Sequence, residues 1–340
     1  MTGFERIRYL GGGYFGEVWL ERDEALNRLC AAKYLKNGED LGGRSIFAEA
    51  QAMALAEHPN VVQVYSADHV LDVPVIRMEF LPDGSIHDRY GKSALPVRDA
   101  VSAIEDACRG LEFLHNRNML HRDIKPANLM LAPSGAIKVS DFGLACGKEQ
   151  VSEAPIGYVT HLPPESVADP GYIDSVQGDV YAMGVTLHRL VNSDAVMDTE
   201  AWGDNLIDLI RLGRFPARDS YLPHVHDPLR KVIKKALHIN AERRYKSPSE
   251  LRHALEATRP VVSWQVLGED TWDGTSADGQ NSWRARVFPN KKGRSSFGLD
   301  RRRGDGKYRA IRGDSAVFDE RSEAISHASI VLDRVARTGK

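Results

Sequence analysis

The sequence predicts an α+β fold, because stretches with the spacing of strands and stretches with the spacing of helices follow one another along its 340 residues. Near the N-terminus, the extended segments 6–10 and 18–20 flank a glycine-rich stretch, which predicts a β-hairpin. In the C-terminal region, residues 283–287 alternate between apolar and basic, as in a strand with one buried face. The middle of the chain instead has apolar residues three or four positions apart, as on a buried helix face: Val101, Ile104, Cys108, Leu111 and Leu114.

The first element is the glycine-rich hairpin. Gly11, Gly13, Gly16 and Val18 give the pattern GxGxxGxV between the two extended segments. Glycines at this spacing let backbone amides approach a triphosphate, because no Cβ stands in the way. A dinucleotide-binding unit is excluded, since no parallel strand–helix–strand pattern with an acidic residue about twenty positions on follows the glycines.

The next element is a helix that we expect over residues 45–57. Ile46, Ala50 and Met53 form an apolar stripe at helical spacing there. Glu49 lies on the same predicted helix.

Two motifs carry the most information about function. They are the octapeptide HRDIKPAN at residues 121–128 and the tripeptide DFG at residues 141–143. Phosphoryl transfer from ATP needs a carboxylate that orients and deprotonates the incoming hydroxyl, and separate oxygen ligands that hold magnesium on the phosphates. Asp123 fits the first role, and Asn128 and Asp141 fit the second. Eight ordered positions followed by a DFG are not expected by chance.

Together with the glycine-rich hairpin, these motifs resemble those of the eukaryotic-like (Hanks-type) serine/threonine protein kinase family. The resemblance covers about residues 5–258. It implies a bilobal kinase domain at residues 1–258, with a small β-rich N-terminal lobe at about 1–80 and a mostly helical C-terminal lobe at about 81–258. Lys125, two residues after Asp123, indicates a serine/threonine enzyme.

The resemblance implies ATP and Mg²⁺ as cofactors and assigns roles to individual residues. Lys33, in the segment Cys30-Ala31-Ala32-Lys33, is expected to pair with the α and β phosphates and to be held by Glu49. Lys125 is expected to steady the γ-phosphate. The other expected ATP-binding residues belong to the hairpin, the adenine pocket and the hinge: Gly11, Gly13, Gly16, Val18, Ala31, Met78, Glu79, Leu81 and Met130.

Three further residues match structural positions of the family. Asp179 matches the buried aspartate that anchors the backbone of the catalytic loop. Arg244 matches the arginine that pairs with the glutamate of the APE motif, which is Glu165 in the segment Pro163-Pro164-Glu165. The resemblance implies that all three residues are structural and not catalytic.

The activation segment, residues 141–165, contains few hydroxyl groups. Arg122 matches an arginine that commonly binds a phosphate in this segment. Ser152 and Thr160 are therefore candidate autophosphorylation sites, and a segment ordered without modification is the alternative. Tyr158 stands where serine/threonine members of the family have a threonine, so the acceptor preference stays open.

The cysteines and the apolar runs indicate the cellular compartment of the protein and the kinds of site that it lacks. The three cysteines, Cys30, Cys108 and Cys146, have no CxxC spacing, which excludes a disulfide framework and a cysteine zinc site and suits a reducing compartment. No apolar run approaches the length of a membrane span. We therefore expect a soluble, cytoplasmic protein without membrane attachment.

The remaining residues, 259–340, predict a small C-terminal domain with three of the five tryptophans. Strands are expected at residues 283–287, 296–299 and 307–312, after an irregular loop over 268–282. A helix with an N-cap at Asp319 or Ser322 follows. The expected order is thus β-β-β-α.

This small domain is basic. It carries 16 Lys and Arg against 11 Asp and Glu, whereas the rest of the chain carries 29 against 36. The basic residues concentrate on the expected hairpin: Lys291, Lys292, Arg294, Arg301, Arg302, Arg303, Lys307, Arg309 and Arg312. These residues form a solvated basic face, or dock an acidic protein, or bind nucleic acid; the sequence leaves the three uses open.

The sequence thus predicts a serine/threonine protein kinase that phosphorylates protein substrates, with a C-terminal domain that recognises a substrate or partner. Three alternatives stay open. They are an ATP-binding scaffold without turnover, a nucleic-acid-binding regulator whose kinase part controls the basic tail, and a kinase that acts on a small molecule.

Overall fold

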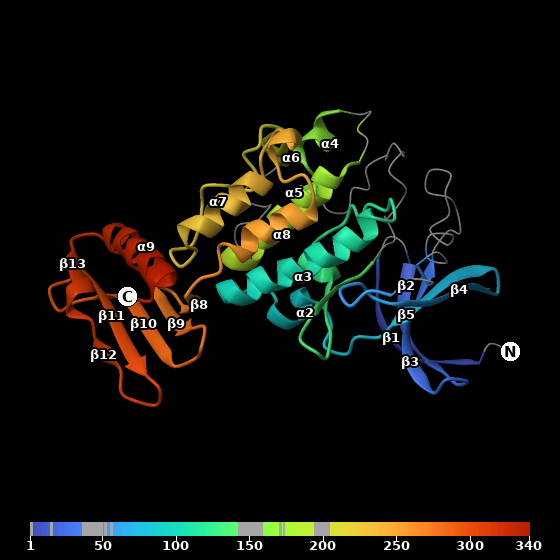
Figure 1. Ribbon diagram of the computed structural model, residues 1–340, viewed down its shortest axis with the longest axis horizontal. Helices are drawn as coiled ribbons and strands as arrows, with labels where there is room; N and C mark the ends of the chain where they lie inside the picture. The colour runs from blue at the N-terminus through green and yellow to red at the C-terminus, as the bar shows by residue number, and fades with distance from the viewer. Residues whose placement is uncertain are drawn as a thin grey trace.

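The computed structural model describes residues 3–13, 16–35, 50, 53–54, 57–141, 159–169, 172, 174–193 and 205–340. An N-terminal sheet and a C-terminal sheet lie at opposite ends of the long axis, and helices fill the space between them (Figure 1). The predicted α+β class and the division into a β-rich and a helical lobe are confirmed.

The N-terminal sheet has five antiparallel strands in the order β1-β2-β3-β5-β4. The strands are β1 (Phe4–Gly13), β2 (Gly16–Asp23), β3 (Arg28–Leu35), β4 (Val64–Val70) and β5 (Val73–Glu79). Strands β1 and β2 form the predicted hairpin, in which Gly13 pairs with Gly16. Gly16 has a φ of 154°, and a Cβ there would lie 2.1 Å from the carbonyl oxygen of Tyr34. Only glycine therefore lets β2 run this close to β3.

The C-terminal lobe is helical apart from a two-stranded sheet, β6 (Leu129–Leu131) and β7 (Ile137–Val139). Its α-helices are α2 (Ile86–Tyr90), α3 (Val97–His115), α4 (Pro164–Ala168), α5 (Val176–Asn192), α6 (Leu206–Arg211), α7 (Asp227–Ala236) and α8 (Pro248–Glu256). Short 3-10 turns occur at η1 (Pro126–Asn128), η3 (Val159–His161) and η6 (Ala241–Arg243).

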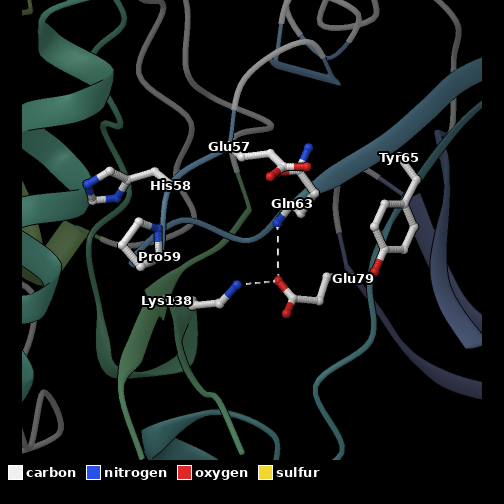
Figure 2. A pocket seen from close by; sticks show the side chains of 7 residues that line it. All are labelled: Glu57, His58, Pro59, Gln63, Tyr65, Glu79 and Lys138. Atoms are coloured by element: carbon white, nitrogen blue, oxygen red, sulfur yellow. Dashed lines mark hydrogen bonds and ion pairs between the residues drawn. The ribbon is translucent and has the colours of Figure 1, made fainter. Parts of the chain in front are cut away.

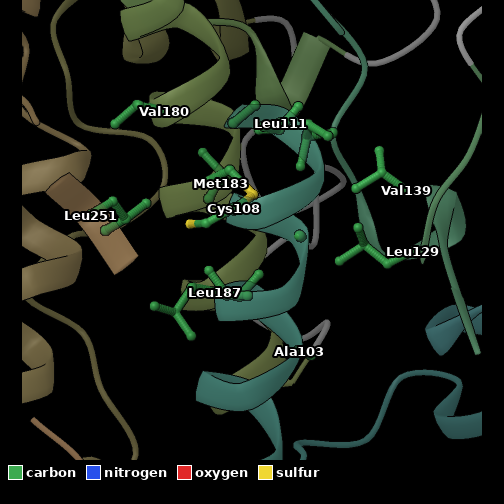
Figure 3. Packing of buried hydrophobic residues seen from close by; sticks show 14 of the residues in the cluster. Ala103, Cys108, Leu111, Leu129, Val139, Val180, Met183, Leu187 and Leu251 are labelled. Atoms are coloured by element: carbon green, nitrogen blue, oxygen red, sulfur yellow. The ribbon is translucent and has the colours of Figure 1, made fainter. Parts of the chain in front are cut away.

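The core of this lobe forms around α3. The apolar residues that predicted the helix are all buried and belong to one hydrophobic cluster with residues of α5 and α8. Figure 3 shows Cys108 of α3 beside Met183 of α5, with Leu251 of α8 to their left. Leu129 and Val139 of the small sheet face α3 from the other side. This packing fixes the loop between β6 and α3, which carries the HRD motif.

Two buried histidines should make the fold sensitive to acid. His188 and His224 have no exposed surface, and burial lowers the pKa of each from 6.5 to about 4. The unfolded chain takes up these protons near pH 6.5, whereas the folded chain does so only near pH 4. The contribution of these two neutral histidines to stability is therefore fully present above pH 6.5. As the pH falls from 6.5 to 4, each histidine should lower the free energy of unfolding by about 1.4 kcal/mol per pH unit.

Urea unfolding at pH 7 and pH 5 measures this loss. His224→Phe should reduce it, while the exposed His253→Gln in α8 should leave it unchanged. Equal stability of the wild-type protein at both pH values would contradict this interpretation.

The C-terminal unit is a sheet with one helix on one face (Figure 1). Its strands are β8 (Val262–Gly268), β9 (Thr271–Ser276), β10 (Asn281–Pro289), β11 (Ser295–Arg303), β12 (Arg309–Ala310) and β13 (Ala316–Phe318). The turn η7 (Arg312–Asp314) precedes β13, and α9 (Arg321–Thr338) ends the unit. Strands β8 to β12 form an antiparallel meander, and β13 pairs with β11. Its tryptophans form a hydrophobic cluster separate from that of the helical lobe.

The predicted β-β-β-α order was wrong for this unit. The expected irregular loop over 268–282 contains β9, and the third expected strand is shorter than residues 307–312. Strand β9 was missed because its middle inward position is Gly274, which lacks an apolar side chain. A Cβ at Gly274 would lie 2.7 Å from the ring of Trp264, so the indole occupies the space that a side chain would need. The expected caps Asp319 and Ser322 were also wrong, because Glu320 is the N-cap of α9.

Side chains and backbone groups join the C-terminal unit to the helical lobe. Arg259 forms an ion pair with Glu105 of α3, whose side chain is only 1% exposed. Asp333 of α9 accepts a hydrogen bond from the backbone N–H of Asp227 at 2.8 Å, and so caps the N-terminus of α7 from another element. Among the described residues, no helix combines the length and the apolar character needed to cross a membrane.

Candidate active site

The backbone of residues 121–123 is held by the start of α5. Asp179 accepts hydrogen bonds from the backbone N–H of His121 at 2.9 Å and of Arg122 at 2.8 Å. Its second contact is the ring of His115, at 2.7 Å. Burial alone would raise the pKa of Asp179, but the hydrogen bonds and the positive charge nearby outweigh it and hold the pKa below its ordinary value. The carboxylate is thus ionised and fixed where the sequence placed an anchor for the loop.

Asp123 lies in a ring of hydrogen-bond donors. Lys125 Nζ donates to its Oδ2 at 2.6 Å, and Asn128 Nδ2 donates to the same oxygen at 3.0 Å. Asn128 Nδ2 also donates to the backbone carbonyl of Asp123 at 2.7 Å. Three polar residues of the octapeptide, Asp123, Lys125 and Asn128, therefore converge. They do so because the turn η1 folds Asn128 back onto Asp123.

Lys33 and Asp141 come together from opposite lobes. Lys33 Nζ in β3 forms an ion pair with Asp141 Oδ1. Removal of water from around Asp141 would by itself raise the pKa of its carboxyl group. The ammonium group of Lys33 outweighs this effect and holds the pKa below its ordinary value. The side chain of Asp141 is 41% exposed, so its ionised oxygens can reach a ligand. Glu49, the expected partner of Lys33, lies outside the described residues, as do Phe142 and Gly143.

Ser140 connects the residues around Asp123 with the segment that carries Asp141. Its backbone N–H donates to the carbonyl of Asn128 at 2.9 Å, and its hydroxyl donates to the same oxygen at 3.2 Å. Its own carbonyl lies 2.9 Å from Nε2 of His121. Ser140 thus holds the segment before Asp141 against the octapeptide, a role that no motif indicated, because backbone atoms make most of the contacts.

The expected adenine-binding residues line facing strands. In the sheet register, Val18 pairs with Lys33, and Ala31 pairs with Met78. Met78 and Met130 pack against a cluster of three buried residues, Val62, Leu81 and Ala132. Strand β3 therefore places the expected adenine contacts next to the lysine.

The side chain of Glu79 makes its own polar contacts, apart from those of Lys33 and Asp141. Its Oε2 accepts from Lys138 Nζ at 2.7 Å and from the backbone N–H of Gln63 at 3.3 Å. Figure 2 shows these two contacts in the wall of a cavity of about 530 Å³. The lining residues are Glu57, His58, Pro59, Gln63, Tyr65, Glu79 and Lys138. None of Lys33, Asp123 and Asp141 lines this cavity, so it is distinct from the polar groups described above.

The expected structural pair lies in the C-terminal lobe. Arg244 donates from Nη1 and Nη2 to the two carboxylate oxygens of Glu165 at 2.7 and 2.6 Å. The guanidinium is fully buried, and it also donates to three backbone carbonyls: His238, Gln177 and Ile239. All three nitrogens of the guanidinium therefore donate to acceptors in the protein.

The activation segment is described only in part. Ser152 and Tyr158 lie outside the described residues. The hydroxyl of Thr160 lies 3.0 Å from His161 Nδ1, in the turn η3. Arg122, the expected phosphate-binding arginine, lies 2.9 Å from a carboxylate oxygen of Asp174.

The donor set suits a nucleotide with a divalent metal. Asp141 is an ionised carboxylate, and Asn128 uses its amide nitrogen toward Asp123, which leaves the carbonyl oxygen as the atom for a ligand. Hard oxygen ligands of this kind are those that Mg²⁺ prefers. The ammonium groups of Lys33 and Lys125 supply positive charge for phosphate oxygens.

Comparison with known proteins agrees with the arrangement of these residues. Residues 4–255 match the sequence profile of the family described as protein kinase domain. The chain is similar to the serine/threonine-protein kinase PknB of Mycobacterium leprae, with 31% identity over 260 residues, 72% of this chain and 41% of that protein. It is also similar to PknB of Mycobacterium tuberculosis H37Rv, with 32% identity over 269 residues, 73% of this chain and 42% of that protein. The serine/threonine-protein kinase PrkC of Bacillus subtilis is 26% identical over 281 residues, 78% of this chain and 43% of that protein. The chain thus spans about two fifths of the length of these relatives.

Proposed function

The chain belongs to the protein kinase family, and we propose that it transfers the γ-phosphate of ATP to serine or threonine hydroxyls of protein substrates. The observation that carries the proposal is the arrangement of two polar groups next to each other in the fold: the ion pair of Lys33 with Asp141, and the hydrogen bonds of Lys125 and Asn128 to Asp123. Ser140, the residue before Asp141, joins the two groups through its hydrogen bonds to the backbone of Asn128. Phosphoryl transfer consists mainly of positioning and electrostatic stabilisation, and this set provides both.

Each residue of the set receives a proposed role. Asp123 orients the acceptor hydroxyl and takes its proton. Lys125 stands beside Asp123 and stabilises charge on the γ-phosphate. Lys33 binds the α and β phosphates, with Glu49 as its proposed second partner. When bound, a divalent metal, which we propose to be Mg²⁺, would neutralise charge on the phosphates, and Asn128 and Asp141 would hold it.

The other proposed ATP contacts follow the strands. Gly11, Gly13 and Gly16 of the hairpin cover the phosphates with backbone groups. The apolar residues Val18, Ala31, Met78 and Met130 enclose the adenine, and the backbone of Glu79 and Leu81 pairs with its edge. The ion pair of Glu79 with Lys138 supports this role, because it engages the side chain elsewhere and so assigns the proposed adenine contact to the backbone.

The alternatives have less support. A scaffold without turnover has no need of the complete set of Lys, Asp, Asn and Asp residues. The similarity to serine/threonine-protein kinases favours protein over a small molecule as the acceptor. A cytoplasmic location stays a prediction from the cysteine pattern, and Cys30 and Cys108 are buried free thiols.

Phosphoamino-acid analysis tests the proposal. The purified chain is incubated with γ-labelled ATP, MgCl₂ and a generic basic protein, and the labelled residues are identified by mass spectrometry. Label on serine or threonine is expected. Label on tyrosine alone would show that Tyr158, in place of the family's threonine, has changed the acceptor preference.

We also propose that residues 259–340 form a separate domain that docks an acidic protein partner or substrate. Seven exposed basic residues lie at or near the two ends of the β10–β11 hairpin: Lys291, Lys292, Arg294, Arg303, Lys307, Arg309 and Arg312. On the strands between them, Arg284 pairs with Asp273 at 2.8 Å and Arg286 with Asp300 at 2.9 Å. These carboxylates would repel a continuous phosphate backbone, which favours a protein over nucleic acid.

Retention on immobilised ligands separates these partners. At low ionic strength we expect binding to an acidic peptide, weakened by salt and by Lys291→Ala/Lys292→Ala but unchanged by Lys231→Ala on α7. Salt-sensitive retention on duplex DNA without retention on the peptide would instead support the nucleic-acid alternative.

A further inference from the structure

Arg122, the residue directly before Asp123, forms a buried ion pair with Asp174. Its Nε lies 2.9 Å from Asp174 Oδ2, and the two side chains are 10% and 19% exposed. Asp174 stands directly before Ser175, the N-cap of α5. The start of α5 therefore holds Arg122 twice, by the backbone through Asp179 and by the guanidinium through Asp174.

The backbone at Arg122 needs such restraint. Its φ is +67°, a left-handed conformation that non-glycine residues seldom adopt. A residue held in this region is strained and persists only where its surroundings over-determine it. This conformation sets the direction in which the chain enters Asp123, so the restraint on Arg122 is a restraint on the carboxylate of Asp123.

The charge of Arg122 needs a counter-ion as well. A guanidinium this far from water is costly without one. The sequence left two expectations open. Either a phosphate on Ser152 or Thr160 is the counter-ion of Arg122, or the activation segment is ordered without modification. The carboxylate of Asp174 is already in place beside the guanidinium. Burial raises the pKa of Asp174, and Arg122 opposes the rise, so the two groups are coupled.

We propose that Asp174 is a positioning residue that replaces an activation-segment phosphate as the counter-ion of Arg122. Phosphoryl transfer then requires no modification of Ser152 or Thr160. The inference rests on the proposed kinase activity and adds how the site is kept in its working geometry.

The first test uses wild-type protein before and after treatment with a broad-specificity phosphatase. The phosphatase is removed before initial rates of transfer to a peptide are measured, and mass spectrometry verifies that Ser152 and Thr160 carry no phosphate both before ATP is added and at the end of the initial-rate period. We expect kcat of the two samples to agree within about twofold, since a twofold change is under 1 kcal/mol. A fall of tenfold or more after treatment, about 1.4 kcal/mol, would overturn the inference. This arm requires no variant, so it is decisive even if a variant fails to fold.

The second test uses Asp174→Asn, which keeps the shape but removes the charge. We expect kcat to fall about tenfold or more while KM for ATP stays nearly the same, because the lost interaction acts on Asp123 and not on nucleotide binding. Asp174→Glu should recover part of the rate, which a purely structural defect would not explain. The matched control is Asp219→Asn, which breaks an exposed ion pair with Lys234 and should leave kcat unchanged.

The outcomes separate the two proposals. Unchanged kcat in Asp174→Asn, with loss of activity in the phosphatase-treated wild type, would assign the counter-ion role to a phosphate. An untreated wild-type protein that transfers no phosphate at all would overturn the proposed function, and this inference with it.

Discussion

Asp123→Asn should lower kcat by roughly 10²–10⁴-fold, the usual contribution of a positioned general base. Asparagine fills the same space but cannot take the proton of the acceptor hydroxyl. Its amide would also face Lys125 and Asn128, both of which donate to Oδ2 of the native carboxylate at 2.6 and 3.0 Å. The affinity for ATP should change little, because the proposed nucleotide contacts belong to Lys33, Asp141 and the glycine-rich hairpin.

Steady-state transfer to a peptide and equilibrium titration with an ATP analogue measure the two quantities separately. Asp208→Asn, which removes an exposed partner of Arg211, is the control and should retain wild-type kcat. A kcat of Asp123→Asn within a few-fold of wild type would remove Asp123 from its proposed role.

Glu165→Gln should lower the free energy of unfolding by about 3 kcal/mol. The guanidinium of Arg244 is fully buried, and the substitution leaves it without an opposite charge. Removal of one partner from a buried ion pair costs about 3–5 kcal/mol, and the lower end applies because the side chain of Glu165 is 26% exposed. The three backbone carbonyls around Arg244 retain their hydrogen bonds, but they cannot neutralise its charge.

Urea unfolding gives this difference as a shift of the midpoint at unchanged slope. The double variant Glu165→Gln/Arg244→Met should be more stable than Glu165→Gln, since it removes the uncompensated charge. Asp208→Asn serves again as a control and should cost less than about 1 kcal/mol, because its ion pair is exposed. A double variant less stable than the single one would show that packing of Arg244, and not its charge, dominates.

The sequence predicted well where local motifs determine the geometry. The hairpin β1–β2 forms at the glycine pattern, and α3 forms where the apolar spacing indicated a helix. The octapeptide folds back on itself within eight residues, so the proximity of Asp123, Lys125 and Asn128 follows from short-range structure. Asp179 and Arg244 were placed through the resemblance, since nothing near them in the chain reveals their partners.

Sequence reasoning missed contacts between distant segments that no motif marks. Asp174 lies 52 positions after Arg122 in a segment without a recognised pattern, and only the fold brings the two together. Ser140 acts mostly through its backbone, which leaves no trace in the residue type. The pairing of Glu79 with Lys138 was missed because the two residues lie 59 positions apart and no motif connects them.

The C-terminal unit was predicted least well, and the reason is physical. Strand periodicity depends on apolar side chains at alternate positions, and β9 has Gly274 where Trp264 needs the space. Strand β12 is only two residues long, too short for any periodic pattern. Tertiary packing, and not local preference, decides the structure of both segments.

The central claim is that the residues around Asp123 and Asp141 form one phosphoryl-transfer site. A single-turnover experiment tests it most directly, with the chain in excess over γ-labelled ATP in the presence of Mg²⁺ and a protein substrate. The account predicts that wild-type protein moves the label from ATP to serine or threonine, and that Asp123→Asn binds the ATP but leaves the label on it. Equal transfer by both proteins, or release of the label only as inorganic phosphate, would contradict the account.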